Sequence, residues 1–262
     1  MNAAAKSKEL KQVQDAVTEL QRSIVLQTTL VAFVLGFIGA IALAAAAYAY
    51  VVSNDPALYA FGIWIFSVYV VFHMCEFGVA AYLRPRETHR ESFMLCRNGA
   101  YAFIHLFGLF EFLVEVYLVP ESWKISRDSI LGGVFRVNFL STTVFTLLML
   151  VVYVVRVVAM LQCGVNFSLR IEVEKRDDHE LVNKGLYGLF RHPSYFGFFW
   201  RSVFYQLIIA NPISFVMHVF VTWVFLKKRI EHEESQMLRD DFFGEAYKKY
   251  RQDTPSGVPL IQ

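Results

Sequence analysis

Long runs of apolar residues restrict the folds open to this chain of 262 residues. A helix needs roughly 20 apolar residues to cross about 30 Å of hydrocarbon, and the runs 24–52, 57–83 and 130–161 are all longer than that. Charged residues make up 18% of the chain, against roughly 25% in a soluble domain. The sequence therefore predicts an all-α, polytopic integral membrane protein.

Six membrane crossings are predicted from these three runs and from three shorter ones. They cover 24–52, 57–83, 99–119, 130–161, 196–210 and 213–226. Each of the last two runs reaches only about 22 Å at 1.5 Å per residue. Asn211-Pro212 alone separates them, so we expect a tight helical hairpin. The first run is long enough to divide into two crossings, and the predicted count lies between five and eight.

Basic residues predict which loops face the cytosol. Lysine and arginine are frequent in 84–97, 162–191 and 227–251, whereas the turns at 53–56 and 211–212 have none. Cytosolic loops of membrane proteins carry such an excess. The alternation favours both termini in the cytosol, with a small cytosolic cap formed by the polar parts of the C-terminal third.

The polar stretch before the first run predicts a separate element. Apolar side chains recur at helical spacing within 1–23 and indicate an amphipathic helix. They are Leu10, Val13, Val17 and Leu20. A transmembrane bundle over 24–161 and a C-terminal segment over 162–262 complete the predicted division of the chain. Because the first residues are polar and charged, we expect no signal peptide.

Cysteine spacing argues against a disulfide or zinc framework, and net charge argues against a nucleic-acid partner. Cys75, Cys96 and Cys163 form no CxxC pair and no even set. That spacing disfavours a disulfide or zinc framework, and no metal site is predicted. The net charge is +2 and no basic stripe is present, so no nucleic-acid partner is expected.

The polar sequence that opens the hairpin predicts a site. It reads Arg191-His192-Pro193-Ser194-Tyr195-Phe196-Gly197. Proline suits the first turn of a helix, whose free amides and dipole then face a ligand. At the other end of the hairpin, on the same side of the membrane, Arg229 and Glu233 share a helix face. Taken singly, such residues are interfacial anchors or solvated pairs. Their combination indicates a binding site.

Ionisable residues also fall within the predicted spans. They are Glu76, Glu111, Glu115, Arg136 and Arg156. In hydrocarbon such residues are costly unless they are paired or face water. The sequence leaves structural pairs and functional groups equally open.

Several motifs follow one another in an order that resembles a known family. They are His179-x-Leu181-Val182, Gly185-x-Tyr187, the sequence 191–197, Asn211-Pro212, Glu233-Glu234, Phe243-Gly244-x-x-Tyr247 and Pro255-x-Gly257-x-Pro259. Over about residues 160–262 the chain is similar to the isoprenylcysteine carboxyl methyltransferases. These are integral membrane enzymes that methylate the C-terminal prenylcysteine of CaaX proteins.

The resemblance implies a site for S-adenosylmethionine. The residues that it assigns to this cofactor are Glu172, His179, Glu180, Leu181, Val182, Tyr187, His192, Pro193, Ser194 and Tyr195. Glu172 stands where the family is expected to have a glutamine. The segment 162–262 is then the cofactor-binding part of a single catalytic domain.

The resemblance assigns catalytic positions to Arg229 and Glu233, near the substrate carboxylate. The family's EExxL reads Glu233-Glu234-Ser235-Gln236-Met237 here, with leucine one position late. Which glutamate corresponds to which is therefore open. The implied substrates are prenylated CaaX proteins such as small GTPases. The implied location is the endoplasmic reticulum membrane, with the active site facing the cytosol.

Three other functions are compatible with the same architecture. The sequence 191–197 has an outline that phospholipid N-methyltransferases and some NADPH-dependent membrane sterol reductases share. A reductase would need a basic pocket for the 2′-phosphate, and no basic cluster is dedicated to one. A non-catalytic membrane scaffold would use the same polar residues as anchors.

Overall fold

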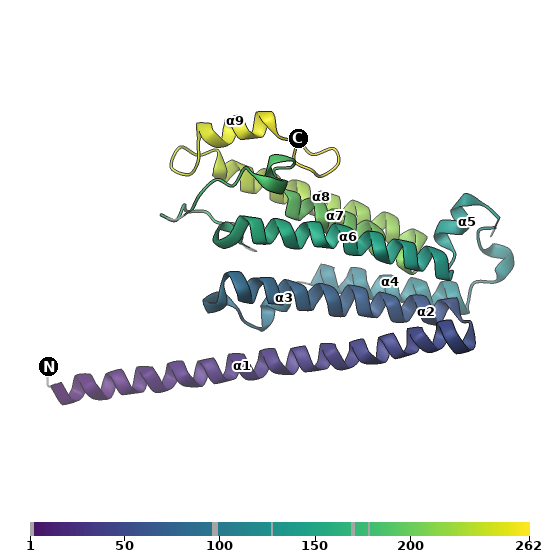
Figure 1. Ribbon diagram of the computed structural model, residues 1–262, viewed down its shortest axis with the longest axis horizontal. Coiled ribbons are helices and arrows are strands. Elements are labelled where there is room, and N and C mark those ends of the chain that lie inside the picture. The colour runs from purple at the N-terminus through teal and green to yellow at the C-terminus, as the bar shows by residue number, and fades with distance from the viewer. Residues whose placement is uncertain (1–2, 96–98, 127, 169–170, 178) are drawn as a thin grey trace.

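The structure, a computed structural model, describes residues 3–95, 99–126, 128–168, 171–177 and 179–262. Over these residues the regular structure is helical and contains no strand, which confirms the all-α prediction (Figure 1). Cys75 and Cys163 are free thiols, and Cys96 lies outside the described residues.

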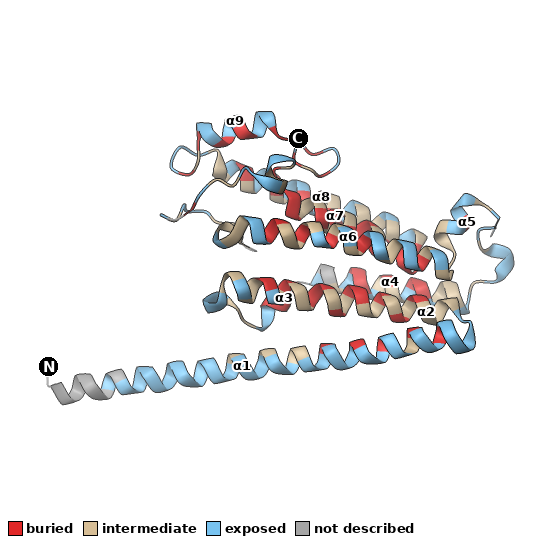
Figure 2. Ribbon diagram, viewed as in Figure 1, coloured by how far each residue is buried: buried red, intermediate tan, exposed pale blue. Residues whose placement is uncertain are grey.

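The first helix, α1 (Ala3–Tyr48), is continuous from the polar N-terminal stretch into the first apolar run. A π-helical turn, Ala49–Ser53, ends it. Most of its surface is exposed along its length (Figure 2). Val13, Val17 and Leu20 of the predicted stripe are uncovered, and the side chain of Leu10 lies outside the described residues.

The second apolar run forms one helix of 28 residues. It consists of α2 (Pro56–Trp64), a π-helical segment (Ile65–Val71) and α3 (Phe72–Leu83). Asp55 caps its start by accepting hydrogen bonds from the amides of Ala57 and Leu58 at 2.9 and 3.1 Å. α4 (Gly99–Tyr117) follows after the loop.

The predicted span over 130–161 was wrong at its start. A short helix, α5 (Ile130–Phe135), precedes the long α6 (Phe139–Cys163), and the chain is extended at Arg136 and Asn138 between them. Asn138 caps α6 by accepting a hydrogen bond from the Ser141 amide at 2.8 Å. Arg136 pairs with Glu121 in the preceding loop. Its charge therefore lies between two helices and has a counter-charge beside it.

The predicted hairpin is confirmed as α7 (Pro193–Ile208) and α8 (Pro212–Met237). Its turn is held from α4. The Asn211 side-chain amide donates to the Gly108 carbonyl at 2.6 Å, and the Glu111 carboxylate accepts from the amides of Ile213 and Ser214 at 2.7 and 2.6 Å. Glu111 is thus the N-terminal cap of α8, supplied by another helix.

α8 extends well beyond the predicted end of the hairpin, and α9 (Glu245–Asp253) follows it at the same end as the start of α7 (Figure 1). α7 packs against α6 on one side and α8 on the other. Two apolar clusters join these helices to the rest, one with α2 and α4 and one with the C-terminal residues. α7 is therefore surrounded, and its first turn is held on several sides.

Three helical segments within the described residues are long and apolar enough to cross a membrane. They are Lys11–Ser53, Pro56–Leu83 and Phe139–Asn166. A polytopic helical bundle is what these segments support. The count of six crossings goes beyond them and stays a prediction.

Replacing Glu111 tests the cap on α8. Glu111→Ala leaves two amides at the start of α8 without their acceptor, which we expect to cost about 1–2 kcal/mol of stability. The melting temperature in detergent, followed by tryptophan fluorescence, should fall by several degrees. Glu111→Gln keeps one acceptor oxygen and should give an intermediate value. An alanine variant that melts together with the unaltered protein would contradict the cap.

Candidate functional site

A pocket lies at the end of the bundle where α6 ends and α7 begins. Its walls come from the end of α6, the segment 179–187, the first turn of α7, the end of α8, and α9. Most of the residues singled out from the sequence line it. They are His179, Glu180, Leu181, Val182, Tyr187, His192, Ser194, Tyr195 and Glu233. The motifs that the sequence spreads over more than fifty residues therefore meet around one cavity.

Three residues singled out from the sequence do not line this pocket. Pro193 is the first residue of α7 and sets its start. Arg229 lines an adjoining small pocket. Glu172 is engaged elsewhere: its carboxylate pairs with Arg84 at 2.9 Å and with Arg176. The other carboxylate oxygen lies 3.3 Å from His179 Nδ1, so Glu172 contacts a residue of the pocket wall without lining the pocket.

Tyr195 connects the two residues expected to be catalytic. Its hydroxyl donates to Glu233 Oε2 at 2.5 Å and accepts from Arg229 Nε at 2.7 Å. Tyr195 lines both this pocket and the small one next to it. Arg229 and Glu233, one helical turn apart on α8, are thereby fixed to the first turn of α7.

The neighbouring glutamate, Glu234, is buried and has a different environment. Its Oε1 lies 2.9 Å from both Arg191 Nε and His192 Nε2, and its Oε2 lies 3.0 Å from Arg251 Nε. Successive residues of a helix point about 100° apart, which directs Glu233 to the pocket and Glu234 to the protein interior. The structure thus gives the two glutamates different environments, whereas the sequence left open which of them corresponds to which in the family motif.

The charge of Glu234 is maintained by its partners. Burial acts to raise the pKa of the Glu234 carboxyl, but the hydrogen bond and charge of His192 and the charge of Arg191 outweigh it, so the pKa lies below its ordinary value. Burial likewise raises the pKa of the Tyr250 phenol to about 12. Glu234 is therefore the ionised centre of this cluster, and Tyr250 is a neutral hydroxyl.

The C-terminal residues complete the wall of the site. The amides of Arg191 and His192 donate to the carbonyls of Pro255 and Ser256 at 2.8 and 3.0 Å. The Tyr250 hydroxyl donates to the Tyr187 carbonyl at 2.5 Å. The backbone of the motif is thereby paired with the end of the chain, and the Arg191 side chain adds bonds to the carbonyls of Arg251 and Thr254.

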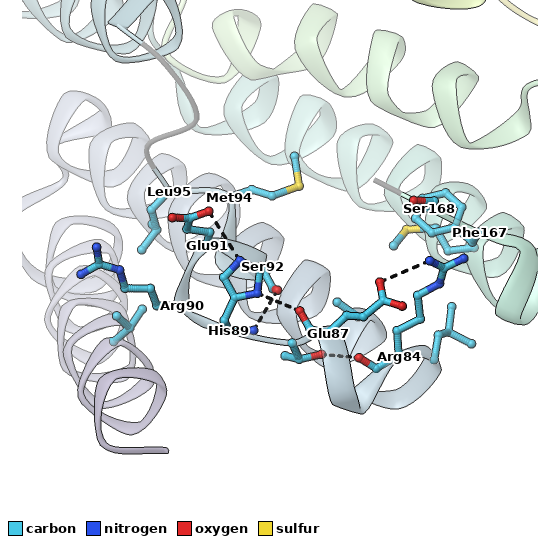
Figure 3. Close-up of a pocket in the computed structure, with 15 residues that line it drawn as sticks. Arg84, Glu87, His89, Arg90, Glu91, Ser92, Met94, Leu95, Phe167 and Ser168 are labelled. Carbon is cyan, nitrogen blue, oxygen red and sulfur yellow. Dashed lines mark hydrogen bonds and ion pairs between the residues drawn. The ribbon is translucent and has the colours of Figure 1, made fainter. Parts of the chain in front are cut away.

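A larger pocket lies beside the first, at the ends of α3 and α6 and against α1 (Figure 3). Arg84 lies on its rim and pairs with Glu87 at 3.3 Å. Phe167 and Ser168 line this pocket, the small pocket with Arg229, and the pocket at the start of α7. The three cavities therefore adjoin one another along the segment that follows α6.

Several lining residues carry no signal in the sequence. Cys163, Asn166, Phe167 and Ser168 come from the end of α6 and the turn after it, and Met237 from the end of α8. None belongs to a motif. Arg191 begins the motif and was expected there, but its role as a partner of Glu234 depends on a contact 43 residues away. No three His, Cys, Asp or Glu side chains within the described residues are placed to hold a metal ion.

Replacing Glu234 tests its role as the centre of the cluster. Glu234→Gln leaves buried cations without their counter-charge, which we expect to cost about 3 kcal/mol. Because the folded pKa is depressed, the charge contributes stability at neutral pH that is lost as the pH falls through the folded pKa. The melting temperatures of the variant and the unaltered protein should differ at neutral pH and converge as the pH falls below the folded pKa of the Glu234 carboxyl. Glu231→Gln, exposed on the same helix, is the control. A difference that does not change with pH would contradict this account.

Comparison with known proteins shows the family of the chain. Residues 144–239 match the model of the Isoprenylcysteine carboxyl methyltransferase family. The protein-S-isoprenylcysteine O-methyltransferase of Saccharomyces cerevisiae is 36% identical over 191 residues, which are 73% of this chain and 76% of the relative. The enzyme of that name from Homo sapiens is 33% identical over 201 residues, 76% of this chain and 65% of the relative.

A solved structure supports the same assignment. It is that of a eukaryotic intramembrane Ras methyltransferase, an isoprenylcysteine carboxyl methyltransferase, and it superimposes with a TM-score of 0.73 at 28% sequence identity. The match covers 93% of this chain and 86% of the other. On these similarities of sequence and fold, the chain belongs to the isoprenylcysteine carboxyl methyltransferase family.

Proposed function

We propose that this chain transfers a methyl group from S-adenosylmethionine to the C-terminal carboxylate of prenylated cysteine in CaaX proteins, giving a methyl ester. The observation that carries the proposal is the link from Arg229 through Tyr195 to Glu233. This link lies where two pockets meet. One is the pocket at the start of α7, called the polar pocket below because charged side chains line it, and the other is the small, largely apolar pocket with Arg229. Family membership supports it independently.

The lining of the polar pocket fits S-adenosylmethionine, which carries both positive and negative charge. The carboxylates of Glu180 and Glu233 suit its sulfonium and ammonium groups. Arg191 also lines the pocket, and its Nη2 is buried without a hydrogen-bond partner among the described residues. A ligand carboxylate would satisfy that atom. When bound, this cofactor supplies an electrophilic methyl group.

The small pocket suits the other substrate. Arg229 lies in it together with the apolar side chains of Phe198, Phe225 and Leu226, a combination that accommodates a carboxylate next to a hydrocarbon chain. A C-terminal carboxylate has a pKa of about 3.3–3.7, so it is already a nucleophile at neutral pH and needs no general base. Arg229 orients the carboxylate, and Glu233 holds Arg229 through Tyr195. Such positioning lowers the barrier by several kcal/mol.

The same proposal includes the placement of the chain in its membrane. Six crossings put both termini and the two polar clusters of the hairpin in the cytosol, where the basic segments 84–97, 162–191 and 227–251 also lie. The location proposed is the endoplasmic reticulum membrane. Prenylated CaaX proteins, small GTPases among them, then reach the site from the cytosol while their lipid stays in the bilayer.

The two other enzyme functions have less support. An amine acceptor, such as a phospholipid headgroup, must be neutral to attack, and a guanidinium beside it brings no advantage, whereas a carboxylate is attracted to Arg229. No relative that we compared is a reductase or a phospholipid methyltransferase. A non-catalytic scaffold is not favoured by the same relatives.

The deciding experiment is methyl transfer by the purified protein in detergent. Labelled S-adenosylmethionine and N-acetyl-S-farnesylcysteine are supplied, and base-labile label on the cysteine derivative is measured. We expect transfer to this substrate and none to phosphatidylethanolamine. Label on the phospholipid amine, or no transfer to either acceptor, would overturn the proposal.

Replacing the two residues on α8 tests their roles. Arg229→Ala and Glu233→Ala should each lower kcat/KM by about a hundredfold or more. The first removes the cation that orients the reacting carboxylate, and the second removes the acceptor that holds Tyr195 and, through it, Arg229. The folded fraction, measured by gel filtration and melting, should hardly change. Lys228→Ala and Glu231→Ala are matched controls, since these side chains are exposed on the same helix. Activity like that of the controls would remove the residue from the mechanism.

A further inference from the structure

An arginine without a counter-charge lies inside the bundle, about two turns after the start of α7. Arg201 is 2% exposed. Within the described residues it forms no salt bridge, and its Nε and Nη2 have no hydrogen-bond partner. A buried charge without a partner is costly, and the cost is greater among helices that face hydrocarbon.

Aromatic rings surround the guanidinium without supplying an anion. Its central carbon lies 3.6 Å from the centre of the Phe72 ring and 5.7 Å from the centre of the Tyr205 ring. Ring faces attract a cation, but a guanidinium has donors only, and its N–H groups still need an acceptor. The rings therefore reduce the cost of burying Arg201 and do not balance its charge.

The buried carboxylates on α3 and α4 already have partners. Glu76, one turn beyond Phe72 on α3, accepts from Arg156 at both of its oxygens, at 2.6 and 2.8 Å. Glu111 on α4 accepts from the first amides of α8. The cluster around Arg201 therefore keeps a net positive charge.

Two other side chains of this cluster add donors. Trp64, whose ring centre lies 5.5 Å from that of Tyr205, has its Nε1 buried without a hydrogen-bond partner within the described residues. His218 stacks on the same tyrosine at 4.8 Å, and its Nδ1 lies 3.3 Å from Gln206 Nε2, an amide nitrogen that donates. The proton of the neutral imidazole is then on Nε2. Donors therefore gather around Arg201, and they require a ligand that accepts.

Water is the alternative occupant. His73 Nδ1 lies 2.7 Å from the Phe93 carbonyl oxygen and carries the proton, so its Nε2 is an acceptor, without a partner in the part of the chain that the structure describes. The His73 ring lies 5.0 Å from that of Phe72. A water molecule between this nitrogen and Arg201 would satisfy hydrogen bonds but would leave the charge unbalanced. An anion would satisfy the donors of Arg201 and balance its charge.

We propose that Arg201 binds a small monovalent anion such as chloride, with further donors from the rings around it. A single-atom ion fits better than a phosphate or carboxylate ligand, because Arg201 lines none of the cavities described above. The bound ion stabilises α7 by balancing the charge that this helix carries into the interior. The site is separate from the methyl-transfer pockets and does not depend on the proposed function.

The test is the thermal stability of the full chain in detergent. Potassium chloride replaces potassium gluconate at a constant total of about 200 mM, so that screening does not change. The melting temperature should rise by about 3–5 °C for each tenfold increase in chloride above its dissociation constant, because the ion binds only the folded state. Bromide should act like chloride.

Arg201→Met removes the charge and keeps a long apolar side chain, so this variant should melt at the same temperature in chloride and in gluconate. Arg86→Gln is the matched control. Arg86 is exposed, and its variant should keep the full response to chloride. If Arg201→Met does not fold, crystals of the unaltered protein grown in bromide decide instead. They should show an anomalous signal within hydrogen-bonding distance of Arg201.

Three results would overturn the anion site. They are a melting temperature of the unaltered protein that is the same in both salts, a chloride response of Arg201→Met equal to that of Arg86→Gln, and bromide crystals without an anomalous signal at Arg201. The first of these would favour water as the occupant. Because methyl transfer is not measured, none of these results depends on the outcome for the proposed function.

Discussion

Hydrocarbon offers no hydrogen-bond partner to a backbone amide or carbonyl, and this constraint decides where polar groups can stand in the chain. Irregular backbone needs partners from the protein itself. At the turn between α7 and α8, Asn211 and Glu111 supply them by pairing with Gly108 and the first amides of α8. At the opposite end of α7, the carbonyls of the C-terminal residues satisfy the amides of the motif. The hairpin is therefore closed at both ends by partners from distant parts of the chain.

The site follows from the way α7 is held at its start. α6 reaches Ser194 through Arg156, α8 reaches Tyr195 through Glu233 and Arg229, and Glu234 fixes the residues just before the helix. The three contacts come from different parts of the sequence and converge on one helical turn. Side chains held by several partners lose little further freedom when a ligand binds, which favours the positioning that methyl transfer to an ionised carboxylate requires.

Local features were predictable from the sequence, and long-range pairings were not. Asn211-Pro212 and the Pro193 helix start are local signals, and the structure places both as expected. The break before α6 was missed because an apolar run hides a single capping residue, Asn138. One partner of Glu172 is Arg84, 88 residues earlier, and no pattern in the sequence relates the two. Apolar periodicity specifies which face of a helix is buried but not which charge will lie opposite it.

The two adjacent glutamates of α8 show how one residue step on a helix divides structure from chemistry. Glu234 turns inward and pairs with Arg191 and Arg251, while Glu233 faces the pocket beside Tyr195. Uncompensated arginines near the pocket would repel a sulfonium and compete for a substrate carboxylate. Glu234 supplies a counter-charge beside Arg191 and Arg251, and Arg156, which is paired with Glu76, lines the small pocket together with Arg229. The ion pairs that stabilise the fold therefore also set the charge that a ligand meets at these pockets.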